Sequence, residues 1–587
     1  MSRVIPPHLR EHVARQHYRL YTAIDHASWR YVMRVSKVFF KKHAHKKYIQ
    51  GLEQTGITTE RIPRITEMDK KLKKFGWSAV TVTGFIPPAV FLEFQSLSIL
   101  PIACDMRRLE HLDYTPSPDI VHEAAGHAPI ISDPKYASYL HKFGEIARKA
   151  IFAKEDLKVY EAIKYLSDIK ENPETKPQEV EVAYQRLHEA YKKVPYVSEA
   201  TKLSRLGWWT IEYGLVKTSE SFKIYGAGLL SSLGESYSAI MKNVKRLPLT
   251  IDCVNTDYDI TTQQPQLFYV GDLTELASVI DELASTMAYK LGGVKALEVG
   301  KRAETVTTTW LDSGLQIGGI LVDFHLDAQG QPCYLQWSGP SQLAYADSEL
   351  KGHSAKYHKQ GFGTPIGLLK KIKKSPAELS INDMKTLGLK KGSFAELEFA
   401  SGVTVSGKFV SSVKKQNKNI IFTFKNCQVK WRDKILFDPA WGNFDMACGE
   451  KVVSVFGGAP DRGAYLRVTQ KTKFKVKNQV TNLTAADRPL VPLYASVRTL
   501  RERRAKVGLS SSDLKKLIRI YEKLTKNFSS DWLLRLEILE LLKDIDNEKL
   551  KMSLRKDLFR LSKKSRVLAS LIHRGLELMG GANQRNS

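Results

Sequence analysis

Two histidines five positions apart, His122 and His127, constrain how the segment from Tyr114 to Pro129 can fold. On an ideal helix this spacing places the second side chain roughly 140° away from the first. Both imidazoles can therefore reach one metal ion only if the helix ends or distorts between them. Gly126 and Pro129 are residue types that break a helix. We expect a distorted turn here, with the two histidines as metal ligands.

A third ligand is expected at Glu212, in the stretch LSRLGWWTIEYGL. An ionised carboxylate among aromatic and aliphatic residues is costly unless a positive group holds it. Two imidazoles and one carboxylate with open positions make up the facial triad of non-haem Fe(II) enzymes. A zinc protease motif is excluded, because the position one turn after His122 is Gly126. A hydrogen-bonded structural cluster remains the alternative on spacing alone, and a hydrolytic zinc enzyme is a further rival.

Four sequence blocks, in order, carry a resemblance to a known family. They are YIQGLE with IPRITEM and FGWSAVTVTGFIPPAVFLEF, then LPIACDMR, then LDYTPSPDIVHEAAGHAPIISDPKYA, then LGWWTIEYGLVKTSESFKIYGAGLLSSLGE. From about Gln16 to about Leu291 the chain resembles the catalytic domain of the pterin-dependent aromatic amino acid hydroxylases. The resemblance implies an Fe(2+) centre, with a tetrahydropterin and O2 as co-substrates and an aromatic amino acid as substrate.

The resemblance also assigns roles to individual residues. The implied metal ligands and catalytic residues are His122, His127 and Glu212; the pterin contacts are Ile86, Phe91 and Glu123; the substrate contacts are Arg107, Thr115, Trp208, Tyr213, Ser231 and Ile260. A guanidinium suits a substrate carboxylate because its planar fork binds two oxygens at once. From the residues alone, Phe91 could equally be ordinary core and Glu123 a solvent-facing glutamate.

One residue departs from the family pattern, and two residues indicate which amino acid is the substrate. Gly207 stands where the family usually has a tyrosine beside the iron, so pterin alignment or coupling efficiency can differ here. Trp208 is typical of phenylalanine and tyrosine hydroxylases, and an aliphatic residue at Ile260 favours phenylalanine over tyrosine. We therefore expect hydroxylation of phenylalanine to tyrosine, a step of phenylalanine catabolism, with tryptophan hydroxylation as the alternative.

The formal charge of +28 raises the question of nucleic acid binding. The basic residues are spread over the whole chain, which is typical of solvated helix faces, so no nucleic acid partner is expected. A non-catalytic basic scaffold built on a hydroxylase core is the rival hypothesis. Five scattered cysteines, a charged N-terminus and no membrane-spanning stretch indicate a cytoplasmic protein. The oligomeric state stays open.

At 587 residues the chain is too long for one ordinary core. We expect a mainly α catalytic domain over residues 1–293, a β-rich domain of unknown role over 294–485, and a helical C-terminal bundle over 486–587. Alternating apolar and polar runs indicate the strands of the second domain. The charged segment from Glu155 to Leu203 is expected to be a helical insertion on the outside.

Overall fold

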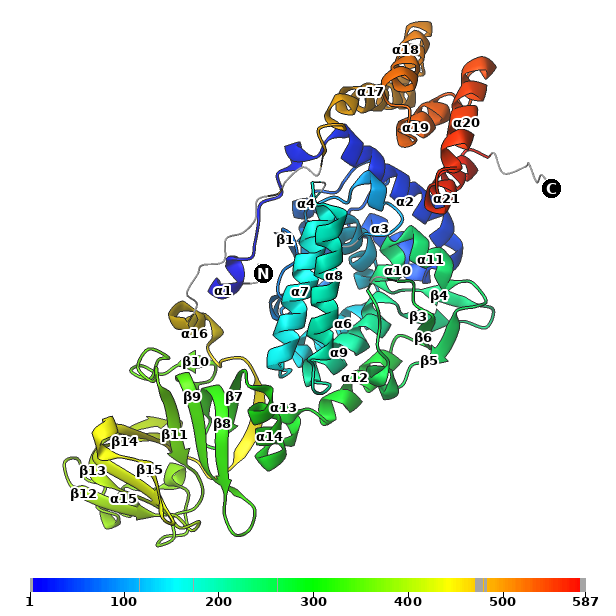
Figure 1. The fold of residues 1–587 in the computed structure, drawn as a ribbon. Coiled ribbons are helices and arrows are strands. Elements are labelled where there is room, and N and C mark those ends of the chain that lie inside the picture. Colours follow the sequence, from blue (N-terminus) through cyan, green and yellow to red (C-terminus); the bar gives the residue numbers. More distant parts are fainter. Residues whose placement is uncertain are drawn as a thin grey trace.

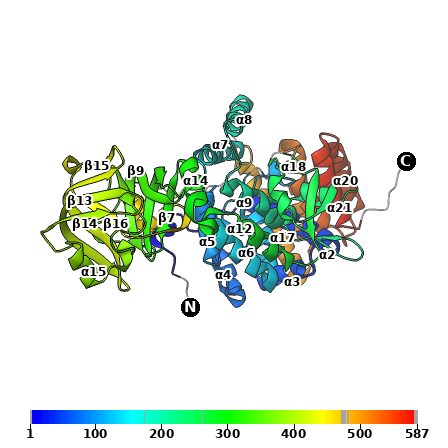
Figure 2. The same cartoon turned by 90° about the horizontal axis from the view of Figure 1, so that it is seen from below.

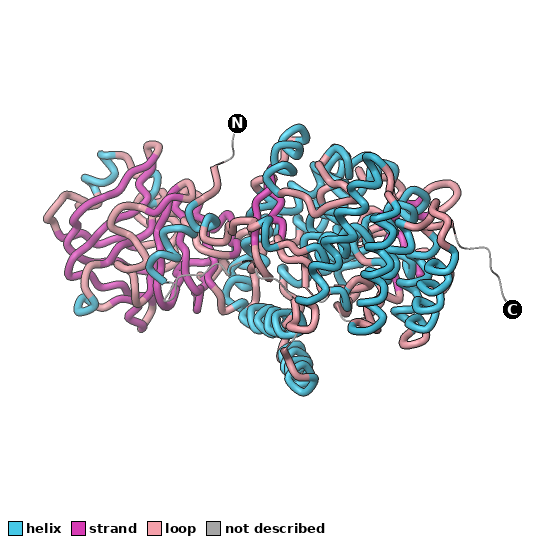
Figure 3. Tube along the Cα trace, turned by 90° about the horizontal axis from the view of Figure 1, so that it is seen from above, coloured by secondary structure: helices cyan, strands magenta, loops and turns pink. Residues whose placement is uncertain are grey.

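The computed structural model describes residues 4–115, 117–172, 174–260, 262–469, 479 and 483–580. The molecule is elongated, with the strands of the β-rich region at one end and the C-terminal helices at the other (Figures 1 and 3). The predicted fold class is confirmed: a mainly helical N-terminal region precedes a β-rich region and a C-terminal helical stretch. The exact domain boundaries stay predictions.

The N-terminal region is built from helices with two small sheets. Its helices are α1 (Pro7–Arg10), α2 (Ala23–His43), α3 (Lys46–Gln54), α4 (Ile65–Leu72), α5 (Pro88–Ser96), α6 (Pro134–Ala147), α7 (Lys154–Glu171), α8 (Pro177–Lys192), α9 (Glu199–Gly207), α10 (Ala227–Ser231), α11 (Leu233–Ala239), α12 (Glu275–Ser285), α13 (Ala288–Leu291) and α14 (Gly293–Ala303). Its strands are β1 (Ser78–Val82), β2 (Ile99–Ala103), β3 (Leu215–Lys217), β4 (Phe222–Ile224), β5 (Lys245–Pro248) and β6 (Gln266–Val270). Strands β3 to β6 form one sheet in the order β4-β3-β6-β5.

The parallel pair of β1 and β2 brings together the loops that follow the two strands. The backbone N–H of Gly84, after β1, donates to the Asp105 carboxylate at 2.9 Å. The carbonyl of Asp105, after β2, accepts from Ile120 N–H at 2.8 Å. Three segments that carry predicted site residues are therefore fixed to one another through Asp105.

Helices α7 and α8 form a hairpin that projects from the N-terminal region (Figure 2). Its small apolar core is its own and consists of Ala162, Leu166, Ala183 and Leu187 with partly buried neighbours. The hairpin lies within the predicted insertion. A core that small gives the two helices little packing beyond their mutual contact.

The β-rich region contains two sheets. Its strands are β7 (Val306–Leu311), β8 (Leu315–Leu326), β9 (Pro332–Tyr345), β10 (Ser348–Glu349), β11 (Gly361–Pro365), β12 (Phe394–Glu398), β13 (Val403–Lys415), β14 (Lys418–Trp431), β15 (Lys434–Phe437), β16 (Phe444–Ala447) and β17 (Val452–Gly457), and its helices are α15 (Ile381–Thr386) and α16 (Arg462–Thr469). One sheet has the order β10-β9-β8-β7-β17, with β11 also on β9; the other has the order β12-β13-β14-β15, with β16 also on β14. Two clusters of buried side chains lie in this region, and each includes residues from strands of both sheets.

The C-terminal helices are α17 (Val491–Val507), α18 (Ser511–Asn527), α19 (Leu533–Leu541), α20 (Glu548–Ser562) and α21 (Arg566–Glu577). Helices α17, α19 and α21 pack against α2, and the buried leucines of the C-terminal helices belong to the same continuous cluster as the core of the N-terminal region (Figure 1). A buried ion-pair group reinforces this contact, because Arg30 of α2 lies 2.8 Å from Glu537 of α19.

All five cysteines are buried free thiols, as their scatter along the sequence predicts. Among the described residues, no helix combines the length and the apolar character that a membrane crossing requires.

Candidate metal centre and substrate pocket

The predicted helix distortion between His122 and His127 takes the form of a π-helical turn over Val121–His127. A π-turn closes i to i+5 hydrogen bonds, so it is wider than an α-turn and brings positions five apart toward one face. Glu212 ends a second π-helical turn, Trp208–Glu212. Both predicted ligand segments therefore depart from α-helical geometry at the point where their side chains must converge.

Helix α10 packs against both π-turns, and glycines allow its close approach. A Cβ added to Gly126 would lie 2.7 Å from the carbonyl oxygen of Ala227. A Cβ added to Gly226 would lie 2.4 Å from the carbonyl oxygen of Glu212. Because neither position has room for a larger side chain, the two turns are held against α10 at backbone distance.

The three predicted ligands meet at one point. The Nε2 atoms of His122 and His127 are 3.2 Å apart. The Glu212 carboxylate lies 3.5 Å from His122 Nε2 and 3.3 Å from His127 Nε2. Ligand bonds of about 2.0–2.2 Å to one ion give donor separations of this size. The donor set and its spacing therefore fit a divalent metal ion.

Ser231 of α10 sets the tautomer of His122. Its hydroxyl donates to the carbonyl of Ala227 at 2.8 Å and lies 2.9 Å from His122 Nδ1. Because the hydroxyl proton is used on Ala227, Ser231 accepts from the His122 Nδ1–H, which leaves a lone pair on Nε2. The nitrogen that faces the cluster is thus the one able to bind a metal.

The charges of the cluster favour a cation. Burial lowers the pKa of His122 to about 4, so this imidazole is neutral. Burial alone would raise the pKa of Glu212, but His127 and His122 outweigh it and lower the pKa to about 2. Burial would lower the pKa of His127, but the Glu212 charge raises it. An ionised carboxylate facing imidazole nitrogens provides the negative charge and lone pairs that a metal ion needs.

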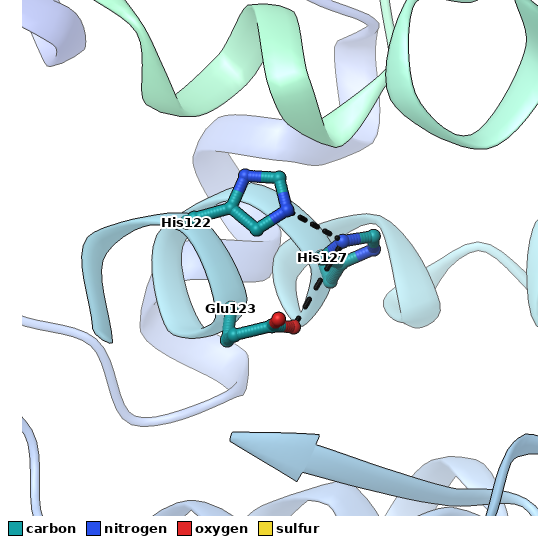
Figure 4. Close-up of side chains that lie close together, drawn as sticks. All are labelled: His122, Glu123 and His127. Carbon is teal, nitrogen blue, oxygen red and sulfur yellow. Dashed lines mark hydrogen bonds and ion pairs between the residues drawn. The ribbon is translucent and has the colours of Figure 1, made fainter. Parts of the chain in front are cut away.

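Glu123 adds a second carboxylate beside the cluster (Figure 4). Its Oε2 lies 3.9 Å from His127 Nε2, and burial raises its pKa to about 8. The side chains of His127 and Glu123 are 1% and 7% exposed, whereas those of His122 and Glu212 are 17% and 23% exposed. The cluster is therefore closed on the Glu123 side and accessible on the other.

Arg107 lies close to the cluster, and its guanidinium is already hydrogen-bonded to a carboxylate of this chain. Its Nε and one terminal nitrogen each donate to Asp119 at 2.8 Å, and the other terminal nitrogen donates to the carbonyl of Ser231 at 2.9 Å. Asp119 also accepts from the backbone N–H of His122 at 3.0 Å. Asp119 thus links the arginine directly to the start of the ligand turn.

Trp208 and Tyr213 stack on each other with ring centroids 4.6 Å apart. Tyr258, which the sequence reasoning missed, stacks on the other side of Trp208 at 4.2 Å. Ile260 contributes its carbonyl, which accepts from the Tyr114 hydroxyl, so the Ile260 segment is held next to the ligand segment. Trp208, Tyr213 and Tyr258 thus form one stack of aromatic rings, and Tyr213 directly follows Glu212 in the sequence.

Two of the three predicted pterin residues, Ile86 and Phe91, lie in a separate apolar cluster. Ile86 is buried there, and Phe91 of α5 packs against it with Phe94. Thr115 donates its hydroxyl to the carbonyl of Ser117 at 2.9 Å, which fixes the loop between Arg107 and the ligand turn. The shared anchor at Asp105 connects this cluster to the metal ligands.

Gly207, which the resemblance places where the family usually has a tyrosine, lies in a closely packed position. A Cβ at this position would lie 3.1 Å from the Phe143 ring. A tyrosine there would require Phe143 to move.

Tyr136 places a fully buried hydroxyl without a hydrogen-bond partner among the described residues, and the charge of Glu212 contributes to the raised pKa of that hydroxyl.

A helical protein with two imidazoles and one carboxylate converging at an accessible point has the site of the non-haem iron oxygenase class. The sequence profile of the biopterin-dependent aromatic amino acid hydroxylases matches residues 13–164 and 196–309. The chain belongs to that family through these residues, which confirms the resemblance stated from the sequence. The unmatched residues between the two ranges lie in the α7–α8 hairpin.

Similar proteins include phenylalanine-4-hydroxylases of bacteria. The one from Pseudomonas aeruginosa is 29% identical over 264 residues, which are 45% of this chain and 84% of that protein. The one from Ralstonia nicotianae is 28% identical over 259 residues, 44% of this chain and 69% of that protein. The structure of the Chromobacterium violaceum phenylalanine hydroxylase with bound iron(III) and 7,8-dihydrobiopterin is 26% identical and covers 48% of this chain and 94% of its own, with a TM-score of 0.37.

Proposed function

We propose that this protein is an Fe(2+)- and tetrahydropterin-dependent monooxygenase that hydroxylates phenylalanine to tyrosine. The observation that carries the proposal is the convergence of His122, His127 and Glu212, whose donor atoms lie 3.2–3.5 Å apart. Membership of the hydroxylase family supports the reaction class. The similarity to phenylalanine-4-hydroxylases at 28–29% identity supports the substrate.

In this proposal the two imidazoles and the Glu212 carboxylate hold ferrous iron from one side. When bound, iron and the reduced pterin supply the two-electron activation of O2 that no side chain can provide. Ser231 keeps His122 in the ligating tautomer. The partly exposed side chains of His122 and Glu212 mark the side from which O2 and substrate would reach the site.

Arg107 is proposed to bind the substrate carboxylate. Its bonds to described residues use three of the five guanidinium N–H groups, so two are left for substrate. Because the side chain is 0% exposed, the lining of the site must move aside when the carboxylate arrives. Trp208, Tyr213 and Ile260 would then enclose the ring, with Thr115 as a polar contact.

The pterin is proposed to stack on Phe91 beside Ile86, with Glu123 as the acid that reaches it. Burial raises the pKa of Glu123 to about 8, so the carboxyl holds its proton at neutral pH before a cation binds. A protonated carboxyl donates a hydrogen bond as well as accepting one. Its Oε2 has no hydrogen-bond partner among the described residues, which leaves this oxygen able to form one with a ligand.

Turnover with defined components tests the proposal. The purified chain with ferrous iron, a tetrahydropterin, O2 and phenylalanine should form tyrosine, measured by chromatography with equimolar pterin oxidation. Tyrosine and tryptophan are tested in parallel. Turnover of tryptophan alone would replace phenylalanine as the substrate, and no turnover of any aromatic amino acid would overturn the proposal.

Alanine variants of His122, His127 and Glu212 test the site separately. Each should lose bound iron and activity together, whereas His141→Ala should keep both. His141 is the matched control because it lies on α6 in the same region with a side chain 39% exposed. Unchanged iron content in all three ligand variants would refute the ligand assignment.

A further inference from the structure

A second group of potential metal ligands lies in the β-rich region, formed by His353, His358 and Asp445. The two imidazoles approach within 3.2 Å, from Nδ1 of His353 to Nε2 of His358. The Asp445 carboxylate lies 3.9 Å from the same His353 nitrogen. All three residues are buried, at 8%, 9% and 6% exposure. Two segments of the chain, the loop with both histidines and the strand with Asp445, thus bring two nitrogens and an oxygen to one enclosed point.

Backbone hydrogen bonds fix both histidines to the same strand. The carbonyl of His353 accepts from Leu343 N–H of β9 at 3.0 Å, and the carbonyl of His358 accepts from Ser341 N–H of β9 at 3.0 Å. The loop that carries the histidines therefore cannot shift along β9 without breaking these bonds. The positions of the two imidazoles follow from the sheet and do not require a bond between them.

Asp445 reaches the group from the other sheet. It lies on β16, opposite Thr423 of β14, and its Oδ1 accepts from the Thr423 hydroxyl at 2.7 Å. This bond turns Oδ2 toward His353. Tyr357 closes the group, because its ring lies edge-on to His358 with centroids 4.7 Å apart. The group thus spans the junction between the two sheets.

The chemistry of the group is that of a metal-binding set. Imidazole nitrogens and carboxylate oxygens are donor types that bind divalent metal ions in proteins. Within the described part of the chain, the only ion-pair distance of Asp445 is the one to His353. A buried carboxylate beside two imidazoles is a setting that a bound cation would stabilise.

The N-terminal cluster provides a comparison within the same molecule. There, too, two histidines five positions apart place ring nitrogens 3.2 Å from each other beside a carboxylate. Tetrahedral coordination with bonds of about 2.0–2.1 Å gives donor separations of about 3.4 Å. The separations of 3.2 and 3.9 Å in the second group lie on either side of this value.

We propose that His353, His358 and Asp445 form a second metal site, which takes a divalent ion of the Zn²⁺ class. Imidazole and carboxylate ligands suit zinc, and three protein ligands leave a fourth position for water. The ion would join the loop on β9 to β16, and so connect the two sheets of the β-rich region. The site is independent of the hydroxylase centre and of the function proposed for it.

Zinc binding to a full-length variant that lacks the first site tests the second. His122→Gln with His127→Gln removes two ligands of the hydroxylase centre and leaves the second group intact. After removal of metal with a chelator, this variant should bind one Zn²⁺ per chain in a titration against a chromophoric chelator. Binding of no zinc would overturn the proposal, and this outcome does not depend on disturbing the β-rich region.

Adding His353→Gln and His358→Gln to that variant should abolish the remaining zinc binding. The matched control is His325→Gln, because His325 is a histidine of the same region that stacks on Trp431 at 4.9 Å and lies outside the group. The control should still bind one zinc. Retention of one zinc after loss of His353 and His358, in protein that keeps its circular dichroism spectrum, would also overturn the proposal.

Discussion

Ser231→Ala should weaken metal binding at the hydroxylase centre more than it weakens the fold. The hydroxyl accepts from His122 Nδ1 at 2.9 Å and donates to the carbonyl of Ala227 at 2.8 Å. Alanine leaves the Nδ1–H without this acceptor, and a buried donor without a partner costs about 1–3 kcal/mol. Loss of such a partner to a ligating histidine typically weakens metal binding by about 10–100-fold. We expect a loss of this size in ferrous iron affinity.

The measurement is anaerobic competition for ferrous iron against a chelator of known affinity. Ser236→Ala is the matched control, because Ser236 is 1% exposed and its hydroxyl donates to the carbonyl of Leu233 at 3.2 Å. Both variants lose a buried hydroxyl and leave its hydrogen-bond partner unsatisfied, so the free energy of unfolding of each should fall by about 1–3 kcal/mol. Only Ser231→Ala should change iron affinity. Equal iron affinity in Ser231→Ala and the wild type would refute the tautomer argument.

Two further predictions concern contacts between the regions. Burial alone would raise the pKa of Glu93, but His8 and Arg462 outweigh it and lower the pKa from 4.5 to about 2. By linkage, the lowered pKa means that ionised Glu93 contributes about 3 kcal/mol to the free energy of unfolding. This contribution is fully present above pH 4.5 and is lost as the pH falls through about 2. Glu93→Gln should therefore destabilise the protein at pH 7 and progressively less toward pH 2. Arg30→Met should cost about 3–5 kcal/mol in urea unfolding, because it removes the cation from the buried carboxylate group that includes Glu540.

The exposed pair Arg61 and Glu67 provides controls for both predictions. Each side chain is 48% exposed, so Glu67→Gln and Arg61→Met should each change the free energy of unfolding by less than about 1 kcal/mol. A Glu93→Gln effect that stays constant between pH 7 and pH 3 would contradict the linkage argument. An Arg30→Met effect as small as that of Arg61→Met would show that the contact between α2 and α19 does not stabilise the protein.

The sequence was sufficient to predict that the histidine turn is distorted, but not how. Gly126 is compatible with a helix that ends and with one that widens. The outcome depends on α10, whose Ala227 carbonyl comes within 2.7 Å of where a Cβ of Gly126 would lie. That approach joins segments about one hundred residues apart, and no local pattern contains it. Glu212 was predictable for a different reason, because a carboxylate among aromatic residues requires a positive partner.

Roles that depend on side-chain partners were less accessible from the sequence. Ser231 was expected as a substrate contact, and its hydroxyl is hydrogen-bonded to His122 Nδ1 at 2.9 Å. The Arg107 guanidinium was expected to bind the substrate carboxylate, and two of its nitrogens already donate hydrogen bonds to Asp119. Hydrogen-bond partners of this kind are set by the packing of distant segments. The substrate role of either residue stays a prediction.

In the β-rich region, too, the sequence predicted the local strands but not how distant strands pair. Alternating side chains predicted strands such as Val403–Lys415, where buried and exposed positions alternate over the first residues. The sequence did not indicate that β17 pairs with β7 or that β16 pairs with β14. His353 and His358 repeat the five-residue spacing of the N-terminal pair, so this signal was present. Asp445 was not linked to them, because only the sheet order brings it close.

The two added regions contact the hydroxylase region at elements that carry its candidate site residues. Arg462 of the β-rich region binds Glu93 on α5 at 2.9 Å, two residues after Phe91. Arg574 of α21 binds Asp113 at 2.9 Å, directly before the segment with Thr115 and the ligand turn. Both contacts are charged and partly buried, so each restricts a segment that would otherwise be a surface loop or a short helix. The geometry of the predicted pterin and substrate contacts therefore depends on residues outside the family match, which is why activity measurements on this protein require the full chain.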